Sequence, residues 1–450
     1  MMAQAKNRIT EGVIWKQLLS YFFPILLGTF FQQLYNTVDT IVVGRFVGTQ
    51  ALAAVGATSA LISLVTGFFV GMSSGATVLV SQFYGAGDKK GVSRSLHNGL
   101  SLALIMGATI SLVGLFAGQT ILGWMQTPES CLEDAGLYAK IYFAGAIGSM
   151  VYNMGSGILR AMGDSKRPTI FLMITCLMNV VGDLLFVLVL DMGVAGVALA
   201  TVLSQTISAV LVLITLAKLP DEMSFRFRKL SVDRKLLGRI LAVGVPAGLQ
   251  MTMFDLAGTL IQSGVNAFGE VTVAAWTAYC KTDFLTWMIS GAFGVSITTF
   301  VGQNYGAGKY DRIKKAVWVC MGMSICLVGL LSFVEILLRK PILSIYSADP
   351  EVIRMGARLM LWTVPFNFLF MPVEVFAGSM RGAGYSVVPM VVMCVCVCVF
   401  RVLWVLTVVV KYHYIEMLAV CYPISWLLAS LVLLAVYLRG NWLKGLERME

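Results

Sequence analysis

The sequence is dominated by long apolar runs that short polar turns interrupt at regular intervals. Twelve of these runs are long enough to cross a bilayer as helices, which requires about 20 apolar residues each. The expected spans are residues 16–44, 51–81, 93–122, 133–161, 168–190, 194–217, 237–266, 271–302, 313–338, 353–380, 387–410 and 416–438. Only 12% of the residues are charged, whereas a soluble domain has about 25%. The chain is therefore expected to be an all-α integral membrane protein, and not a soluble enzyme or a secreted disulfide scaffold.

Most of the positive charges lie on one side of the expected spans. The net charge is +10, and 24 of the 33 Lys and Arg residues fall on the side of the membrane on which the N-terminus lies. Cytoplasmic loops carry such an excess of Lys and Arg, so both termini are expected in the cytoplasm of a multi-pass cell-membrane protein. This topology explains the basic charge without a nucleic-acid partner.

Several chemical signatures are missing from the sequence. There is no HExxH zinc motif, no phosphate-binding GxxxxGK[ST] loop and no CxxC pair, and the nine cysteines are interpreted as packing residues. No secretory cleavage site follows the first apolar run, so this run is expected to remain as an uncleaved anchor. We expect a protein that is not an enzyme and has no cofactor. An ion gradient would supply the energy for any uphill transport.

The two halves of the sequence repeat each other at an offset of 221 residues. The segment Tyr84-Gly85-Ala86-Gly87 matches Tyr305-Gly306-Ala307-Gly308, and Gly157, Arg160, Gly163, Ser165 and Pro168 match Gly378, Arg381, Gly384, Ser386 and Pro389. Each half has six spans, so both enter the membrane in the same direction, as in two-lobed transporters that work by alternating access. The expected organisation is an N-lobe (1–217), a basic cytoplasmic linker (218–236) and a C-lobe (237–450), with the two bundles around a central cavity.

Four polar residues of the N-lobe fall at similar depth within the expected spans. They are Asp39, Asn179, Asp183 and Thr201. Charged side chains inside a membrane are costly, so those that are retained usually have a function. Two carboxylates, an amide and a hydroxyl provide oxygen ligands for a hard cation such as Na⁺, and they also suit a proton. A purely structural hydrogen-bond cluster is the alternative.

The C-lobe does not repeat this set and has other charged residues within its spans. They are Asp255, Lys281, Asp283, Glu374 and Arg401. Asp255 and Lys281 lie at similar depths in neighbouring spans, where they would form a structural ion pair. The alternative is a second ion site or cationic-substrate site formed by Asp255, Lys281, Asp283 and Glu374, with Arg401 neutralising one acid.

Further polar residues are expected to face the cavity and to contact substrate. Gln32, Tyr35 and Asn36 precede Asp39 at helical spacing, and Asn153 lies in the fourth span.

These motifs resemble those of the multidrug and toxic compound extrusion (MATE) family. The resemblance rests on Leu34-Tyr35-Asn36-Thr37-Val38-Asp39 followed by Gly44, on the segment from Gly157 to Pro168, and on the paired Tyr-Gly-Ala-Gly loops. It implies a membrane antiporter, working as a monomer, that expels cationic or amphipathic compounds in exchange for protons or sodium ions. In one branch of the family the ion site would correspond to Asp39, Asn179, Asp183 and Thr201, and the substrate pocket to Gln32, Tyr35 and Asn153. In another branch acids near Asp255 and Glu374 would couple transport.

Three other functions compete with this one. A flippase for lipid-linked glycans has the same broad architecture, but it should carry several cavity-facing cations for the pyrophosphate, and here only Lys281 and Arg401 lie within spans. A lipid-modifying membrane enzyme would need a catalytic cluster at the interface, and a channel would need a charged pore ring. Ion-coupled efflux is the function that the sequence favours.

Overall fold

The protein is almost entirely helical. A computed structural model describes residues 9–220 and 222–444, so Lys6, Arg8 and Arg448 lie outside the described residues. Eleven helices within the described chain are long and apolar enough to cross a membrane. These helices, and the absence of any strand in the described residues, confirm the predicted all-α membrane fold.

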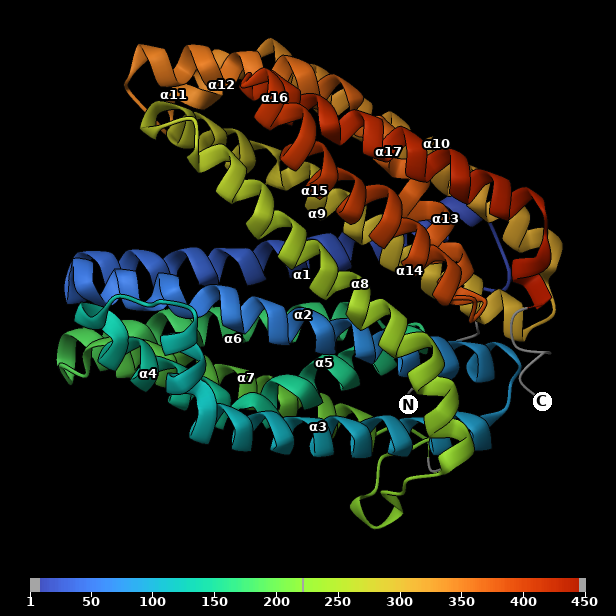
Figure 1. The fold of residues 1–450 in the computed structure, drawn as a ribbon. Helices are drawn as coiled ribbons and strands as arrows, with labels where there is room; N and C mark the ends of the chain where they lie inside the picture. The colour runs from blue at the N-terminus through green and yellow to red at the C-terminus, as the bar shows by residue number, and fades with distance from the viewer. Residues whose placement is uncertain (1–8, 221, 445–450) are drawn as a thin grey trace. The chain divides into compact units, whose positions relative to one another are not determined.

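The chain forms two compact units, and the boundaries between them fall inside two long helices (Figure 1). We call residues Pro24–Gly248 the N-unit, and the described residues before Pro24 together with those from Leu249 onward the C-unit. Helices α1 (Ile14–Val42) and α8 (Arg234–Asn266) each contribute to both units. The lobe boundaries that the sequence predicted, with a separate linker at 218–236, stay a prediction.

The remaining elements divide between the units as follows. The N-unit contains η1 (Val43–Val47), α2 (Thr49–Gly85), α3 (Lys89–Trp124), α4 (Glu129–Ala144), α5 (Ala146–Ala161), α6 (Lys166–Leu184), η2 (Leu185–Val189), α7 (Gly193–Ala217) and η3 (Phe227–Lys229). The C-unit contains α9 (Glu270–Gly306), α10 (Tyr310–Leu337), α11 (Arg339–Ser344), α12 (Pro350–Thr363), η4 (Val364–Phe370), α13 (Met371–Gly382), α14 (Val387–Met393), η5 (Cys394–Val399), α15 (Phe400–Trp404), η6 (Val405–Val409), α16 (Val410–Tyr412), α17 (Ile415–Leu438) and η7 (Asn441–Lys444).

The fourth predicted span is interrupted in the structure. Residues 133–161 fall into α4 and α5, of 16 residues each, which meet at Gly145. A Cβ atom at this glycine would stand 2.4 Å from Cγ1 of Val202 on α7, so the chain approaches α7 more closely here than another residue would permit. This break is why eleven long helices are found where the sequence predicts twelve spans.

The internal repeat is present in the helix boundaries. Helices α2 and α9 both have 37 residues, and each begins after a glycine with positive φ, Gly48 (122°) and Gly269 (89°). The same correspondence holds at the turns after these helices, where Gly87 and Gly308 have φ of 74° and 69°. Conformations with positive φ favour glycine, so the repeated glycines fix the same turns in both halves.

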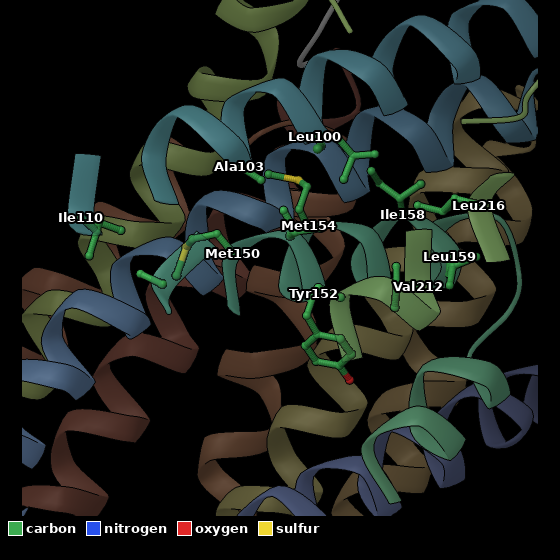
Figure 2. Close-up of a cluster of buried hydrophobic side chains, with 14 of the residues drawn as sticks. Leu100, Ala103, Ile110, Met150, Tyr152, Met154, Ile158, Leu159, Val212 and Leu216 are labelled. Atoms are coloured by element: carbon green, nitrogen blue, oxygen red, sulfur yellow. The ribbon is translucent and has the colours of Figure 1, made fainter. Parts of the chain in front are cut away.

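The core of the N-unit is a cluster of buried apolar side chains where α2, α3, α5 and α7 pack together. Figure 2 shows Leu100 and Ala103 of α3 close to Met154 and Ile158 of α5. Burial of such side chains stabilises the unit through close packing, because lipid tails are as apolar as the core itself.

The segment before α1 is held on the C-unit by Asn304, Lys309 and Arg312, whose side chains donate hydrogen bonds to its backbone carbonyl oxygens. Arg312 on α10 donates hydrogen bonds to the carbonyl oxygens of Ile9, Glu11 and Gly12 and to Oε1 of Gln17. Further along, Phe22 stacks on Phe293 of α9 with ring centroids 4.3 Å apart. These contacts explain why the first turns of α1 belong to the C-unit.

The connection between α7 and α8 is docked onto the N-unit. Phe225 is buried and stacks on His97 of α3, whose Nε2 accepts a hydrogen bond from the Arg226 N–H at 3.1 Å. His97 is itself buried, with only 2% of its surface exposed. The linker therefore has a fixed attachment at its centre.

Candidate functional site

Three helical elements of the N-unit position the four polar residues that the sequence singled out. Asp39 lies near the end of α1, just before the π-helical turn η1. Asn179 and Asp183 lie one turn apart on α6, just before the second π-helical turn, η2. Thr201 lies on α7, which packs against α6, η1 and η2. π-helical turns are rare and occur frequently at functional sites, which makes this arrangement notable.

The structure brings Asp39, Asp183 and Thr201 together. Oγ1 of Thr201 donates a hydrogen bond to Oδ2 of Asp39 at 3.3 Å, and the carboxyl groups of Asp39 and Asp183 are close enough to interact electrostatically. Two ionised carboxylates this close repel each other, so a shared proton or a cation between them would stabilise the pair. Asp183 has no exposed surface and Asp39 only 6%.

Several buried atoms of this cluster have no partner among the described residues. Apart from the interaction between the carboxyl groups, neither oxygen of Asp183 and neither side-chain atom of Asn179 has a hydrogen-bond partner. Orphaned buried polar atoms are expensive and point to a ligand or to ordered water. The described residues contain no group of three His, Cys, Asp or Glu suited to a metal. A cation here would therefore also need the amide of Asn179 and the hydroxyl of Thr201.

Three tyrosines lie near Asp39, and two of them, Tyr138 and Tyr142, were missed by sequence reasoning. Tyr35, Tyr138 and Tyr142 all lie within electrostatic range of its carboxyl group. Tyr138 and Tyr142 are one turn apart on α4 and their rings stack with centroids 6.3 Å apart. This spacing was visible in the sequence, but the direction in which the pair faces depends on how α4 packs.

The predicted substrate residues do not all come together. Tyr35 is half-buried, hydrogen-bonds with Gln32 and accepts a hydrogen bond from Gln205 Nε2 at 3.4 Å, while Gln32 and Asn36 are exposed. Asn153 instead donates to the carbonyl oxygen of Ser149 at 2.9 Å. Within the described chain, no hydrogen bond joins Asn153 to the other three.

The predicted C-lobe residues lie at separate places in the C-unit. Asp255 is exposed beside a shallow groove on α8 of about 530 Å³, lined by Phe254, Asp255, Gly258, Thr259, Gln262, Ser263 and Asn266. Lys281 is exposed on α9, and the described residues include no ion pair between it and Asp255. Glu374 lies against Gly294, whereas Asp283 is buried among other partners.

The buried Arg401 does not neutralise an acid through any ion pair of the described residues. Its Nε donates to Oγ of Ser425 at 2.8 Å, and its guanidinium lies 3.9 Å from the ring centroid of Tyr422. Trp426 provides a second ring at 5.7 Å. Aromatic faces attract cations, so these rings account for a charged residue that is only 5% exposed.

Comparison with known proteins identifies the family. The MatE family model matches residues 24–185 and again residues 246–406, so the two copies begin at Pro24 and Pro246. The chain belongs to the MatE family. Members are membrane transporters and not enzymes, and the long apolar helices make this chain a multi-pass membrane transporter.

Relatives and solved structures agree with this membership. The probable multidrug resistance protein YoeA of Bacillus subtilis is 28% identical over 388 residues, which cover 84% of this chain and 83% of the relative. The probable multidrug resistance protein NorM of Thermotoga maritima is 25% identical over 455 residues, 98% of this chain and 95% of the relative. A crystal structure of MATE in the straight conformation has the same fold, with a TM-score of 0.90 at 24% identity over 98% of this chain and 100% of that one.

Proposed function

We propose that this MatE chain is a secondary active antiporter that exports cationic or amphipathic organic compounds in exchange for protons or sodium ions. The observation that carries the proposal is the buried pair of Asp39 and Asp183, which a proton or a cation would stabilise. The relatives named as multidrug resistance proteins support the substrate class. A monomer in the cell membrane, with both termini in the cytoplasm, is the simplest form of such a transporter.

The proposed mechanism couples the charge of the acid pair to substrate binding. When the pair is ionised, repulsion between the carboxylates opposes the packing of α1 against α6 and favours uptake of an ion from outside. Binding of the ion removes this repulsion and changes how α1 packs, which disturbs the neighbouring Gln32, Tyr35 and Asn36. We expect Asn153 of α5 to contact the substrate as well. Substrate is then released to the outside, and alternating access returns the ion to the cytoplasm.

A glycan flippase is the less well supported alternative. It would need several free cations to bind a pyrophosphate, but Arg401 is engaged by Ser425 and Tyr422. An antiporter needs titratable acids instead, which the N-unit provides.

The first test measures uptake of ethidium into inside-out vesicles that contain the full-length protein. A proton gradient and a sodium gradient are imposed separately, because the gradient that drives uptake identifies the ion. Replacing Asp39→Asn or Asp183→Asn removes the titratable pair and should abolish gradient-driven uptake. The matched control is Asp311→Asn, an exposed residue in the first turn of α10, which should transport normally. Full uptake by both acid-pair variants would contradict the proposed coupling.

A further inference from the structure

The connection between α7 and α8 has one face that is fixed to the N-unit and another that is exposed. Phe225 is buried, and its backbone N–H donates to the carbonyl oxygen of Leu216 at 3.0 Å. The ring of Phe227, in η3, packs edge-on against Phe225 with centroids 4.8 Å apart, yet 69% of Phe227 is exposed. Figure 1 shows the connection, drawn in green, projecting beside the first turns of α8. The buried face therefore holds the exposed face in a fixed orientation.

Both described acids of the connection are used to attach it to α3. The carboxylate of Glu222 forms an ion pair with Lys89 at 2.9 Å, and that of Asp233 forms one with Arg94. The backbone carbonyl oxygen of Asp233 also accepts a hydrogen bond from Nδ2 of Asn98 at 3.4 Å. Residues of α3 thus compensate these acids, and the acids are not paired with the basic side chains of the connection.

Four basic side chains remain on the exposed face. Arg228, Lys229, Arg234 and Lys235 are all exposed, and no ion pair of the described residues includes any of them. Positive charge by itself would indicate only that the connection lies on the cytoplasmic side, as the sequence predicts. An exposed aromatic ring beside the charges is not explained by topology, so the face needs a more specific account.

Two large apolar side chains stand among these charges. Val232 is 51% exposed and accompanies Phe227 on the exposed face. Apolar side chains that enter the headgroup region leave water, while neighbouring Lys and Arg side chains attract anionic lipid, and the two effects add. Helix α7 ends at Ala217 and α8 begins at Arg234, so the connection joins two membrane helices and stays near the surface where both end.

The partner that fits this face is anionic and also offers an apolar layer. An acidic protein or a nucleic acid would match the positive charges, but neither supplies an apolar layer beside them at the level of the headgroups. A leaflet that contains anionic phospholipid supplies both, and it lies within reach of any short connection between two membrane helices.

We propose that the exposed face of this connection binds anionic phospholipids of the adjacent leaflet. The four unpaired basic side chains contact the phosphate groups, and Phe227 and Val232 lie between the headgroups. The same segment is attached to α3 and leads directly into α8, so lipid binding fixes the depth of this end of the N-unit in the membrane. The proposal does not depend on the coupling ion or on the substrate.

The test places a fluorescent reporter on the exposed face of the full-length protein. Phe227→Trp is reconstituted into phosphatidylcholine vesicles that contain a small fixed fraction of lipid brominated near the start of its acyl chains. The brominated lipid is either phosphatidylglycerol or phosphatidylcholine, and bromine quenches tryptophan only at short range. The emission of the new tryptophan is the difference from the unmodified protein. We expect stronger quenching by brominated phosphatidylglycerol, and high salt should reduce this preference because it screens exposed charges.

Two double variants in the reporter background test the role of the charges. Arg228→Gln with Lys229→Gln removes two of the four unpaired charges, so it should reduce the difference in quenching between the two lipids by about half or more. Lys314→Gln with Lys315→Gln, an exposed basic pair on α10, is the matched control and should leave the difference unchanged. Val232→Trp serves as a second reporter if Phe227→Trp does not fold.

Three outcomes would overturn the proposal. The first is equal quenching by the two brominated lipids, and the second is a preference that Arg228→Gln with Lys229→Gln leaves unaffected. The third is emission that neither lipid quenches, which would show that the face lies in water and is open to a soluble acidic partner. None of these outcomes bears on the proposed antiport, which the ethidium assay tests separately.

Discussion

At the scale of single residues, the acid pair of the N-unit depends on a few weak contacts. Thr201 Oγ1 is shared between Asp39 Oδ2 at 3.3 Å and the carbonyl oxygen of Val197 at 3.1 Å. Asp183 and Asn179 have no exposed surface at all. Such a cluster changes strongly when it gains or loses one charge, because a buried charge is screened only weakly. This sensitivity is what an ion-coupled transporter requires.

Replacing Thr201→Val should show whether the coupling ion is sodium or a proton. The hydroxyl is an oxygen ligand for sodium, so its loss should raise the sodium concentration for half-maximal uptake by about tenfold. The hydroxyl also stabilises the ionised form of Asp39, so for a proton-driven transporter uptake should saturate at a lower proton concentration. The shift is measured by recording ethidium uptake as a function of sodium or proton concentration. Thr206→Val, an exposed threonine on the same helix, is the control, and an identical shift in it would contradict the assignment.

Some site residues were predictable from sequence and others were not. Asp39, Asn179, Asp183 and Thr201 stand out because polar residues inside apolar spans are rare and costly. Glu335 also interrupts an apolar run, but it lies close to the end of its span, where an exposed glutamate would be unremarkable. Only its 3% exposure distinguishes it. Burial depends on neighbouring helices, and the sequence of one span does not contain that information.

At the scale of elements, α2 and the first half of α8 approach each other closely at four glycines. A Cβ atom at Gly75 would stand 2.1 Å from the carbonyl oxygen of Ile240, and one at Gly71 would stand 2.5 Å from Cα of Gly248. A Cβ atom at Gly244 would likewise stand 2.6 Å from the carbonyl oxygen of Met72. Small residues at four-residue spacing permit such close packing of membrane helices.

Replacing Gly75→Ala should force these helices apart. The added methyl group would meet backbone atoms, which have no rotamer with which to move away, and overpacking of this kind costs about 1–3 kcal/mol. The thermal unfolding midpoint of the purified protein should therefore fall. Gly258→Ala on α8 is the matched control, because nothing lies within 4 Å of its added Cβ atom. Equal midpoints for the two variants would contradict the close approach.

The start of α8 is fixed by an acid whose protonation should weaken it. Oδ1 of Asp233 accepts hydrogen bonds from the N–H groups of Lys235 and Leu236, and Oδ2 accepts one from Arg94 of α3. The Arg94 hydrogen bond is the main cause that lowers the pKa of the Asp233 carboxyl group below its ordinary value, about 3.9. A lowered pKa contributes stability that is present above the unfolded value and is lost as the pH falls through the folded one.

Asp233→Asn should therefore lower the thermal unfolding midpoint at neutral pH, and the difference from the unmodified protein should shrink in acid. The effect is expected to be modest, because the side chains of Arg94 and Asp233 are 65% and 27% exposed. Asp311→Asn is again a suitable control, since it should show no such pH-dependent difference. A constant difference at all pH values would indicate that the carboxylate charge does not matter here.

At the scale of the whole molecule, one repeated scaffold carries two different sets of polar residues. Helices α2 and α9 have the same length and the same glycine before their first turn. The buried acid pair of the N-unit lies on α1 and α6, whereas the buried acids of the C-unit include Asp283 on α9 and Glu335 on α10. The two halves therefore share their turns and helix lengths, while the polar chemistry of each half is independent.

The sequence by itself determined the membrane fold, the repeat and the residues of the N-unit cluster. These follow from local properties: the length of apolar runs, the turns that need glycine, and the cost of a charge inside a span. Only the tertiary structure decided that Glu335 is buried, that α4 and α5 separate at Gly145, and that the residues before Pro24 pack with the second half. The physical reason is that the rotation and packing of a helix depend on many contacts with distant segments. The sequence of one span does not determine those contacts.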